Sequence, residues 1–333
     1  MATNGTNGTN GNGHPKIEDI VIVGGSLGGL MAGVALKTHG YNTTILERTN
    51  AFLLENQGAG IVAGGDTIEY FKKYDRTGKP VAVPSYKRLY LNKQGDVIYE
   101  NEQRQNMTSW DLTYYLLRAN YDRVESGYLQ GAKLPERREG DGEVRYRYGC
   151  TVTDVVEEGE VVRVVFKRKL EDGTEEEESL TTKLLVAADG PSSTTRSILE
   201  QGIERKYAGY VVIRGTVPEA EASQEALDVF RERFCFVSMR LAELLTSADI
   251  VTSSTHRVRL GKESGEGSRI DFWCIGIQNL TYTIAGENGN TEPGHRLLNF
   301  VWYANFDEGS EDLERIMTDK NGRRRRITIP PGA

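Results

Sequence analysis

The sequence predicts a mixed α/β (α+β) chain, in which a βαβ unit near the N-terminus is joined to a second, mostly antiparallel β-sheet domain. Two observations predict this class. Residues 20–48 pass from an apolar run through a glycine cluster and a helical pattern to a second apolar run. Residues 207–303 instead consist of short aromatic and β-branched segments, which are typical of an antiparallel sheet packed on a first domain.

Composition sets the outer limits of function. The chain has 333 residues, enough for two domains, and a net charge of −7 with both signs interspersed, so nothing indicates a nucleic-acid surface. Cys150, Cys235 and Cys274 lack metal-ligand spacing and fit a reducing compartment, so we expect no metal site. The chain shows neither a long apolar run nor a secretory signal, and we expect a cytoplasmic protein without membrane contact.

The N-terminal unit has the pattern of a dinucleotide site of the Rossmann type. Residues 20–23 form an apolar, β-branched run, which ends in a glycine cluster and a helical pattern, and residues 42–46 predict the second strand. Glycines allow a backbone to approach a pyrophosphate, and a helix N-terminus offers it N–H groups. Glu47, at the end of the second strand, is placed to accept hydrogen bonds from an adenosine ribose.

The glycine cluster departs from the G-x-G-x-x-G fingerprint at one position. Gly24 and Gly29 fill the first and third places, but Ser26 occupies the second, where a small residue is needed. The alternative is a tight turn in an ordinary α/β domain with Glu47 merely solvated. Because the strand, helix, second strand and terminal acid are all in register, we favour the dinucleotide site.

The remaining chain is divided by composition and pattern. Residues 1–18 form a polar repeat that we expect to be a disordered tail. We assign residues 19–80 and 105–200 to a discontinuous cofactor-binding domain, and residues 81–104 and 201–333 to a substrate domain.

Two local elements can be predicted within these domains. Strand patterns at 87–91 and 97–100 flank a short polar turn and predict a hairpin. Thr108 or Ser109 is a suitable N-cap for the amphipathic helix that follows.

A second motif lies where another predicted strand ends. Residues 180–187 lead directly into Asp189 and Gly190, at the kind of strand end where open α/β sheets bind ligands. Ser193 and Arg196 follow four and seven positions after Asp189. A strand-terminal Asp-Gly alone is more often a simple turn. Its combination with the βαβ unit about 160 residues earlier makes it specific.

These segments together resemble the para-hydroxybenzoate hydroxylase-like flavoprotein monooxygenases. The N-terminal match is GGSLGG followed by Glu47 and Arg48, and the internal match AADGPSSTTR fits that family's D-G-x-x-S-x-x-R segment. Other stretches, among them QGAGIVAGG, MTSWDLTYYLLR and YAGYVVIRGTVPE, are similar to the dihydroxypyridine-hydroxylase branch. Ser26 also fits that branch.

The resemblance implies FAD as the cofactor. Glu47 and Arg48 would contact the adenosine, Arg118 the phosphate or ribityl region, and Asp189 the flavin side, although spacing alone favours an ordinary surface arginine at 118. The full set of cofactor-binding residues implied in this way is Gly24, Ser26, Leu27, Gly28, Gly29, Glu47, Arg48, Gly60, Arg118 and Asp189.

The implied reaction is hydroxylation of a small aromatic or related substrate through a flavin hydroperoxide, with NAD(P)H as reductant and dioxygen as co-substrate, and secondary metabolism as one setting. The cofactor performs this chemistry, so no single catalytic base is expected. Candidates for the substrate side are Tyr207, Tyr210, Arg214 and His256, although sheet aromatics usually serve packing.

The resemblance is compatible with a homodimeric state. Two other functions stay open. One is a non-catalytic remnant that binds a nucleotide, and the other is an NAD(P)-dependent reductase, against which the AADG segment argues. Two departures from the family bear on them. Its later Gly-Asp segment has no counterpart, so we expect a C-terminally truncated substrate domain, and residues 237–270 look inserted.

Overall fold

The structure is a computed structural model that describes residues 17–51, 60–92, 94–238 and 278–325. The predicted polar tail up to residue 16, almost all of the segment 237–270, His256 and Cys274 lie outside the described residues.

The chain divides into two compact units. Unit 1 comprises Met1–Val83, Asn106–Arg205 and Ile284–Arg296, and unit 2 comprises Pro84–Gln105, Lys206–Thr283 and Leu297–Ala333. Residues 284–296 therefore belong to unit 1, whereas the sequence pattern had assigned them to the substrate domain.

Unit 1 is built on a six-stranded sheet in the order β8-β2-β1-β11-β10-β9. The strand β1 pairs in parallel with β2 on one side and β11 on the other, and β2 pairs in parallel with β8. The strands β9, β10 and β11 form an antiparallel meander. The strand bounds are β1 Ile17–Val23, β2 Thr43–Leu46, β8 Val144–Arg147, β9 Cys150–Glu158, β10 Val161–Lys169 and β11 Glu175–Ala187.

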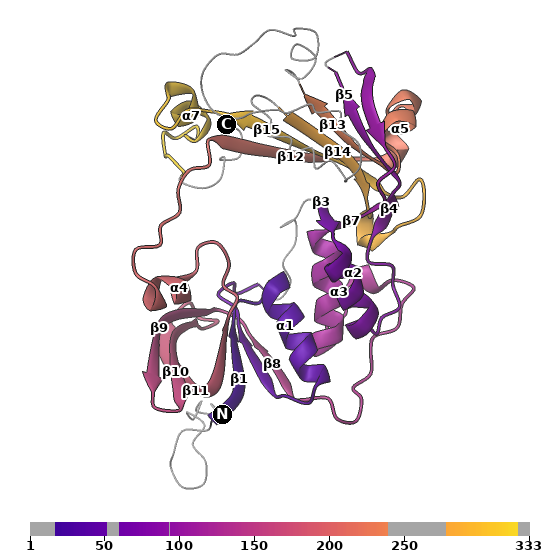
Figure 1. Ribbon diagram of the computed structural model, residues 1–333. Coiled ribbons are helices and arrows are strands. Elements are labelled where there is room, and N and C mark those ends of the chain that lie inside the picture. The colour runs from indigo at the N-terminus through magenta and orange to yellow at the C-terminus, as the bar shows by residue number, and fades with distance from the viewer. Residues whose placement is uncertain (1–16, 52–59, 93, 239–277, 326–333) are drawn as a thin grey trace, which may run out of the picture. The chain divides into compact units, whose positions relative to one another are not determined.

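The α/β layering of unit 1 follows from the alternation of side chains along β1. Ile20 and Ile22 point to one face and pack with Leu30 of α1 and Leu116 of α3, and Val21 and its neighbours on the other face join a second cluster. Helices α1, α2 and α3 lie together beside the sheet (Figure 1). The helix bounds are α1 Leu27–Thr38, α2 Gly65–Tyr74, α3 Trp110–Asp122 and α4 Thr194–Leu199, with short 3-10 turns η1 Gly127–Leu129 and η3 Glu287–Gly289.

The predicted start of α3 is confirmed, because the Ser109 side chain accepts a hydrogen bond from Leu112 N. A three-stranded sheet in the order β3-β7-β4 adds β3 Gly60–Ala63, β7 Gln105–Ser109 and β4 Val83–Ser85.

Unit 2 contains a six-stranded sheet in the order β12-β15-β14-β13-β5-β6. The pairs β12-β15, β13-β14 and β5-β6 are antiparallel, which confirms the mostly antiparallel second sheet and the predicted hairpin. The pair β13-β5 is parallel, which is possible because its two strands are not joined by a tight turn. The bounds are β5 Lys87–Leu91, β6 Val97–Asn101, β12 Tyr210–Pro218, β13 Arg233–Ser238, β14 Gln278–Ile284, β15 Leu297–Asn305, α5 Gln224–Phe230, α7 Glu311–Ile316 and η2 Glu219–Glu221.

Over the described residues, the structure contains no helix long and apolar enough to cross a bilayer. Within the same ranges, no three His, Cys, Asp or Glu side chains gather in a way that would hold a metal ion.

Candidate functional site

The glycine turn lies between the end of β1 and the start of α1, as the sequence pattern predicts. Gly24 has a φ of +102°, a backbone conformation that residues other than glycine rarely adopt. A Cβ at Gly24 would also overlap the backbone of Ala188, and one at Gly29 would overlap the Gly24 carbonyl oxygen. These two positions need glycine for the turn itself and for close packing of helix on strand, which are the first and third roles in the fingerprint.

The two sequence motifs meet at this turn. Because β1 and β11 are parallel neighbours, their carboxyl ends lie at the same edge of the sheet. A Cβ built on Gly24 would lie 2.9 Å from the Cα of Asp189, and Ala188 N donates a 2.8 Å hydrogen bond to Val23 O. The structure therefore brings the Asp189-Gly190 segment into direct contact with the glycine cluster.

The first turn of α1 is open toward an anion. Ser26 is the N-cap residue, but its side chain makes no capping hydrogen bond. The first N–H groups of an α-helix have no partner within the helix. Gly28 is exposed, and a Cβ built there would have no atom within 4 Å. Leu27 is half-buried as the first helical residue. The residues present at this turn therefore fit a pyrophosphate group.

Glu47 is buried at the end of β2, and its carboxylate reaches the glycine turn. Its Oε2 accepts a 2.8 Å hydrogen bond from Gly25 N, and its Oε1 accepts one of 2.8 Å from Thr49 N. Each carboxylate oxygen can accept more than one hydrogen bond. Glu47 is therefore both a brace for the turn and a candidate acceptor for a ribose hydroxyl. The next residue, Arg48, is exposed beside it.

Tyr146 on β8 is a residue of this site that the sequence did not reveal. Its hydroxyl donates a 2.9 Å hydrogen bond to Gly25 O, and a Cβ on Gly25 would overlap the same hydroxyl. Burial raises the pKa of Tyr146, so the hydroxyl stays protonated and serves as a donor. No motif surrounds Tyr146 in the sequence, because its role depends on the pairing of β8 with β2.

Arg118 lies behind Tyr146 and is fully buried. The centre of its guanidinium group lies 3.9 Å from the Tyr146 ring centroid, and its Nε and Nη2 donate to the Asp122 carboxylate at 3.0 and 2.8 Å. Its Nη1 donates to Tyr114 at 2.8 Å, and Nη2 also donates to Tyr148. Burial alone would lower the pKa of Arg118, but the bonds and charge of Asp122 raise it above the ordinary arginine value. Arg118 thus packs on the ring of Tyr146, whose hydroxyl is bonded to the glycine turn.

The carboxylate of Asp189 organises the loop that follows β11. Its Oδ1 accepts from the Ser193 hydroxyl, and its Oδ2 accepts from Thr195 N at 3.0 Å and from the Thr195 hydroxyl at 3.1 Å. Burial opposes ionisation, but these hydrogen bonds lower the pKa of Asp189 below its ordinary value. Ser193 in turn caps α4 by accepting from Arg196 N. The carboxylate is therefore ionised at neutral pH.

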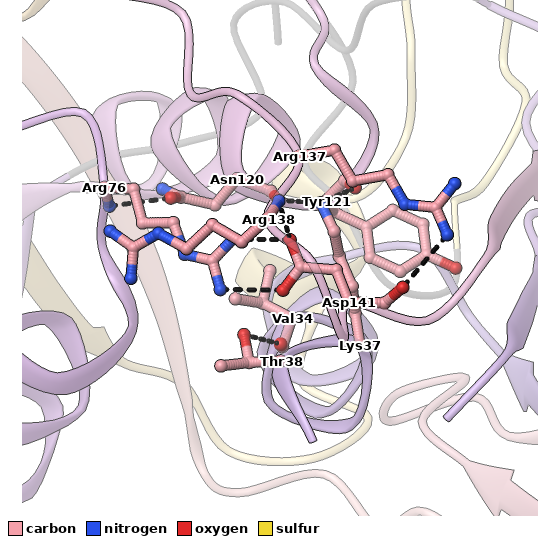
Figure 2. Close-up of polar contacts among 9 residues, drawn as sticks. All are labelled: Val34, Lys37, Thr38, Arg76, Asn120, Tyr121, Arg137, Arg138 and Asp141. Carbon is pink, nitrogen blue, oxygen red and sulfur yellow. Dashed lines mark hydrogen bonds and ion pairs between the residues drawn. The ribbon is translucent and has the colours of Figure 1, made fainter. Parts of the chain in front are cut away.

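A buried polar network anchors the opposite end of α1 (Figure 2). Lys37 is only 5% exposed, and its Nζ donates 2.8 Å hydrogen bonds to the carbonyls of Asn120 and Tyr121 at the end of α3. Arg76 holds the Asp141 carboxylate with two hydrogen bonds of 2.6 and 2.8 Å, which lower the pKa of Asp141 to about 2. Gly142 N donates a 2.9 Å hydrogen bond to Lys37 O, so the loop before β8 is tied to the helix whose first turn forms the glycine site.

The remaining predicted residues lie further from these motifs in sequence. Gly60 begins β3 and pairs with Ser109 of β7 in unit 1. Tyr207 donates a 3.1 Å hydrogen bond to Phe306 O, and the ring of Tyr210 packs edge-on against Tyr303 in unit 2.

Arg214 is exposed on β12 of unit 2. Burial raises the pKa of Tyr282 to about 12, an effect that the Arg214 charge opposes. Arg214 therefore lies close enough to Tyr282 for its positive charge to favour ionisation of the phenol.

A glycine turn at a helix N-terminus, with an acid at the end of the second strand, defines a dinucleotide-binding α/β protein. Comparison with known families identifies the dinucleotide. A model described as an FAD binding domain matches residues 18–232, and one described as FAD binding domain-like matches residues 207–259 and 266–333. The chain belongs to the FAD-binding domain family.

Individual relatives confirm the resemblance to the dihydroxypyridine-hydroxylase branch. The chain is 26% identical over 308 residues to 2,6-dihydroxypyridine 3-monooxygenase of Paenarthrobacter nicotinovorans, an alignment that covers 92% of this chain and 60% of the relative. It is 27% identical over 205 residues to 6-hydroxynicotinate 3-monooxygenase of Pseudomonas fluorescens, covering 61% and 48%. The chain thus spans about half to three fifths of the length of these relatives.

Solved structures share the fold. The structure of 2,6-dihydroxypyridine-3-hydroxylase from Arthrobacter nicotinovorans has a TM-score of 0.64 and 25% identity, and the match covers 94% of this chain and 62% of that one. The p-nitrophenol 4-monooxygenase of Pseudomonas putida has a TM-score of 0.55 at 14% identity, covering 90% and 60% of the two chains.

Proposed function

We propose that this protein is an FAD-dependent monooxygenase that hydroxylates a small aromatic ring, with NAD(P)H as reductant and dioxygen as co-substrate. The observation that carries the proposal is the contact between the Gly24 turn and the Asp189-Gly190 segment. A plain dinucleotide turn needs only the first of these motifs. The second lies beside it through the β1-β11 pairing, and both motifs fall within residues 18–232, which match an FAD-binding domain.

We assign the holding of FAD to the residues around this turn. Gly24, Ser26 and Gly29, with the first N–H groups of α1, would receive the pyrophosphate. Glu47 would accept from the adenosine ribose, and Arg48 lies next to it. When bound, FAD supplies the redox chemistry that activates dioxygen for hydroxylation. The chain's own contribution is to orient the cofactor and substrate and to exclude water.

The relatives suggest the class of substrate. Two of them are named for reactions at hydroxylated pyridine rings, 2,6-dihydroxypyridine and 6-hydroxynicotinate. We therefore propose an electron-rich hydroxylated aromatic or N-heteroaromatic ring as the substrate of this chain. Secondary metabolism as the setting, a cytoplasmic location and a homodimeric state belong to the same proposal, and size-exclusion chromatography with light scattering tests the last of these.

A visible spectrum tests the proposal directly. The purified chain, supplied with FAD, should show bound-flavin absorbance that bleaches with NADH or NADPH and recovers in air. Adding 2,6-dihydroxypyridine or 6-hydroxynicotinate should then accelerate NAD(P)H oxidation and give a product heavier by one oxygen atom in mass spectrometry. A chain that is colourless after incubation with FAD and removal of the unbound FAD contradicts the proposal.

Two outcomes would favour the alternatives. Flavin binding without reduction by either nicotinamide cofactor would indicate a non-catalytic nucleotide-binding protein. Hydride transfer from NAD(P)H to a substrate in the absence of flavin would indicate a reductase, which the match of residues 18–232 to an FAD-binding domain does not favour.

A further inference from the structure

Gly25 occupies a position of the glycine turn where the dinucleotide fingerprint does not require glycine. In the G-x-G-x-x-G register of this turn the glycine places are positions 24, 26 and 29, so Gly25 fills a variable place. The backbone of Gly25 also lacks the positive φ that would itself demand glycine. A Cβ built there would instead overlap the hydroxyl group and the ring of Tyr146. Tyr146 is therefore the residue that excludes a side chain at position 25.

Both polar backbone groups of Gly25 are held by buried parts of unit 1. Gly25 N donates a 2.8 Å hydrogen bond to Glu47 Oε2, and Gly25 O accepts one of 2.9 Å from the Tyr146 hydroxyl. The peptide bond between Gly25 and Ser26 is trans, so its C=O and N–H groups point in opposite directions. Because Gly25 O points toward Tyr146, the N–H group of Ser26 points away from the Tyr146 ring.

The Ser26 N–H group is available to a ligand. Ser26 is the N-cap residue of α1, and its side chain makes no capping hydrogen bond. Ser26 N also donates no hydrogen bond within the part of the chain that the structure describes. An amide whose C=O accepts a hydrogen bond is polarised, and its N–H becomes a stronger donor. The bond from Tyr146 therefore both orients the Ser26 N–H and strengthens it as a donor to an anion.

The Tyr146 ring rests on a fixed support. The centre of the Arg118 guanidinium group lies 3.9 Å from the ring centroid, and the Asp122 carboxylate accepts two hydrogen bonds from the same guanidinium group. Burial raises the pKa of Tyr146, and the Arg118 charge opposes part of that rise. The hydroxyl therefore stays protonated, while the neighbouring cation makes it a better donor to Gly25 O.

We infer that Tyr146 is a positioning residue for the pyrophosphate of the dinucleotide. Its hydroxyl holds the Gly25 carbonyl so that the Ser26 N–H faces the phosphate oxygens, and position 25 is glycine to leave room for that hydroxyl. The inference rests on the proposed function, because the pyrophosphate is that of the FAD assigned to this turn. It concerns unit 1 alone and can be tested without catalysis.

The test compares ligands with and without phosphate on the full-length chain. FAD and ADP both carry a pyrophosphate, and adenosine carries none. Calorimetry measures FAD and ADP binding, and ligand-observed NMR titration measures adenosine binding. We expect the wild-type chain to bind ADP about tenfold or more tightly than adenosine, as a charge-assisted hydrogen bond allows. Equal affinity for ADP and adenosine overturns the inference.

Two matched variants separate positioning from general stability. Tyr146→Phe removes the hydroxyl that holds Gly25 O, and should weaken ADP and FAD binding about tenfold while leaving adenosine within about twofold. Tyr148→Phe is the control. Its ring lies 4.8 Å from the Tyr146 ring, and its hydroxyl accepts a hydrogen bond from Arg118 rather than donating to the turn. It should leave all three affinities within about twofold.

A double-mutant cycle tests why position 25 is glycine. Gly25→Ala should weaken ADP binding about tenfold in the wild-type background, because the new methyl group displaces the Tyr146 hydroxyl. In the Tyr146→Leu background the hydroxyl is already gone and the shorter side chain leaves space. The same change should there cost less than about threefold, since contacting residues are not additive. Equal losses in the two backgrounds would contradict this role of Tyr146.

Other results also overturn the inference. Unchanged ADP affinity in Tyr146→Phe would show that the hydrogen bond does not serve the ligand. Equal losses for ADP and adenosine would show that the side chain only stabilises the turn, and an equal effect of Tyr148→Phe would show a general effect of losing a phenol. If Tyr146→Leu does not fold, the two phenylalanine variants decide alone.

Failure of the proposed function has a different signature. Flavin absorbance is recorded for the same samples after unbound FAD is removed. A chain whose ADP affinity depends on Tyr146 but which retains no flavin would contradict the monooxygenase and support the positioning role. A chain that retains flavin, with equal FAD and ADP affinities in wild type and Tyr146→Phe, would do the reverse. Absence of binding by both ADP and FAD overturns both.

Discussion

Two substitutions in the first turn of α1, Gly28→Ala and Gly29→Ala, separate the effect of helix propensity from the effect of steric overlap. Alanine favours a helix by about 0.5–1 kcal/mol over glycine in both cases. At Gly28 the new methyl group meets no atom within 4 Å, so that gain should appear as higher stability of the FAD-free chain. At Gly29 the methyl group would overlap the Gly24 carbonyl oxygen and lie 3.2 Å from Ile22 Cγ2. Overpacking of this kind costs about 1–3 kcal/mol.

Because both variants gain the same helix propensity, their difference isolates the clash. We expect Gly29→Ala to be less stable than Gly28→Ala by about 1–3 kcal/mol in urea unfolding of the FAD-free chain. Relief of the clash must move the turn, so FAD affinity in a flavin-fluorescence titration should fall at least tenfold, or about 1.4 kcal/mol, in Gly29→Ala. Gly28→Ala serves as the stability control, because its methyl group meets no protein atom within 4 Å. Equal stability and equal FAD affinity of the two variants would refute this account of the turn.

Three further substitutions test the supports of the site. Glu47→Gln should weaken FAD binding by about 1–3 kcal/mol, because the carboxylate that would accept from the adenosine ribose loses its charge; unchanged flavin titrations would contradict the placement of the adenosine. Tyr146→Phe should cost about 1 kcal/mol in urea unfolding, since the Gly25 carbonyl loses its donor, and an unchanged midpoint would argue against that bond. Asp141→Asn should cost about 3 kcal/mol because Arg76 loses its buried partner. The wild-type contribution of Asp141, whose pKa is lowered from 3.8 to about 2, is present above pH 4 and should disappear as pH falls toward 2, while the variant shows no such loss over that window.

The local elements of unit 1 were predictable because each carries its own signal. The apolar run of β1, the glycine cluster and the acid ending β2 appear in sequence order within about 30 residues. Ser109 stands directly before the amphipathic pattern of α3, and the structure shows it as the N-cap. In such segments, short-range patterning and local hydrogen bonds determine the structure, so pattern reading suffices.

The supports of the site could not be read in the same way. Tyr146 contacts Gly25 only because β8 pairs with β2 across about 100 residues of chain, and no local pattern specifies that pairing. Spacing alone favours a surface arginine at Arg118 of α3, yet the side chain is fully buried. Its bonds to Asp122, four residues on in the same helix, are local, but its burial and its contact with the Tyr146 ring depend on how β8 packs against the helix.

Asp189 shows why a motif residue can have two roles that only a structure separates. The family resemblance explains Asp189 as a contact to the cofactor. Its carboxylate, however, already accepts three hydrogen bonds from Ser193 and Thr195 in its own loop. Those bonds hold the segment that contacts Gly24, so loss of the carboxylate would displace the loop even in the FAD-free chain. A defect in flavin binding at Asp189 therefore identifies a cofactor contact only when the stability of the FAD-free chain is unchanged. At Glu47 the same reasoning applies, because one of its oxygens braces Gly25 before any ligand arrives.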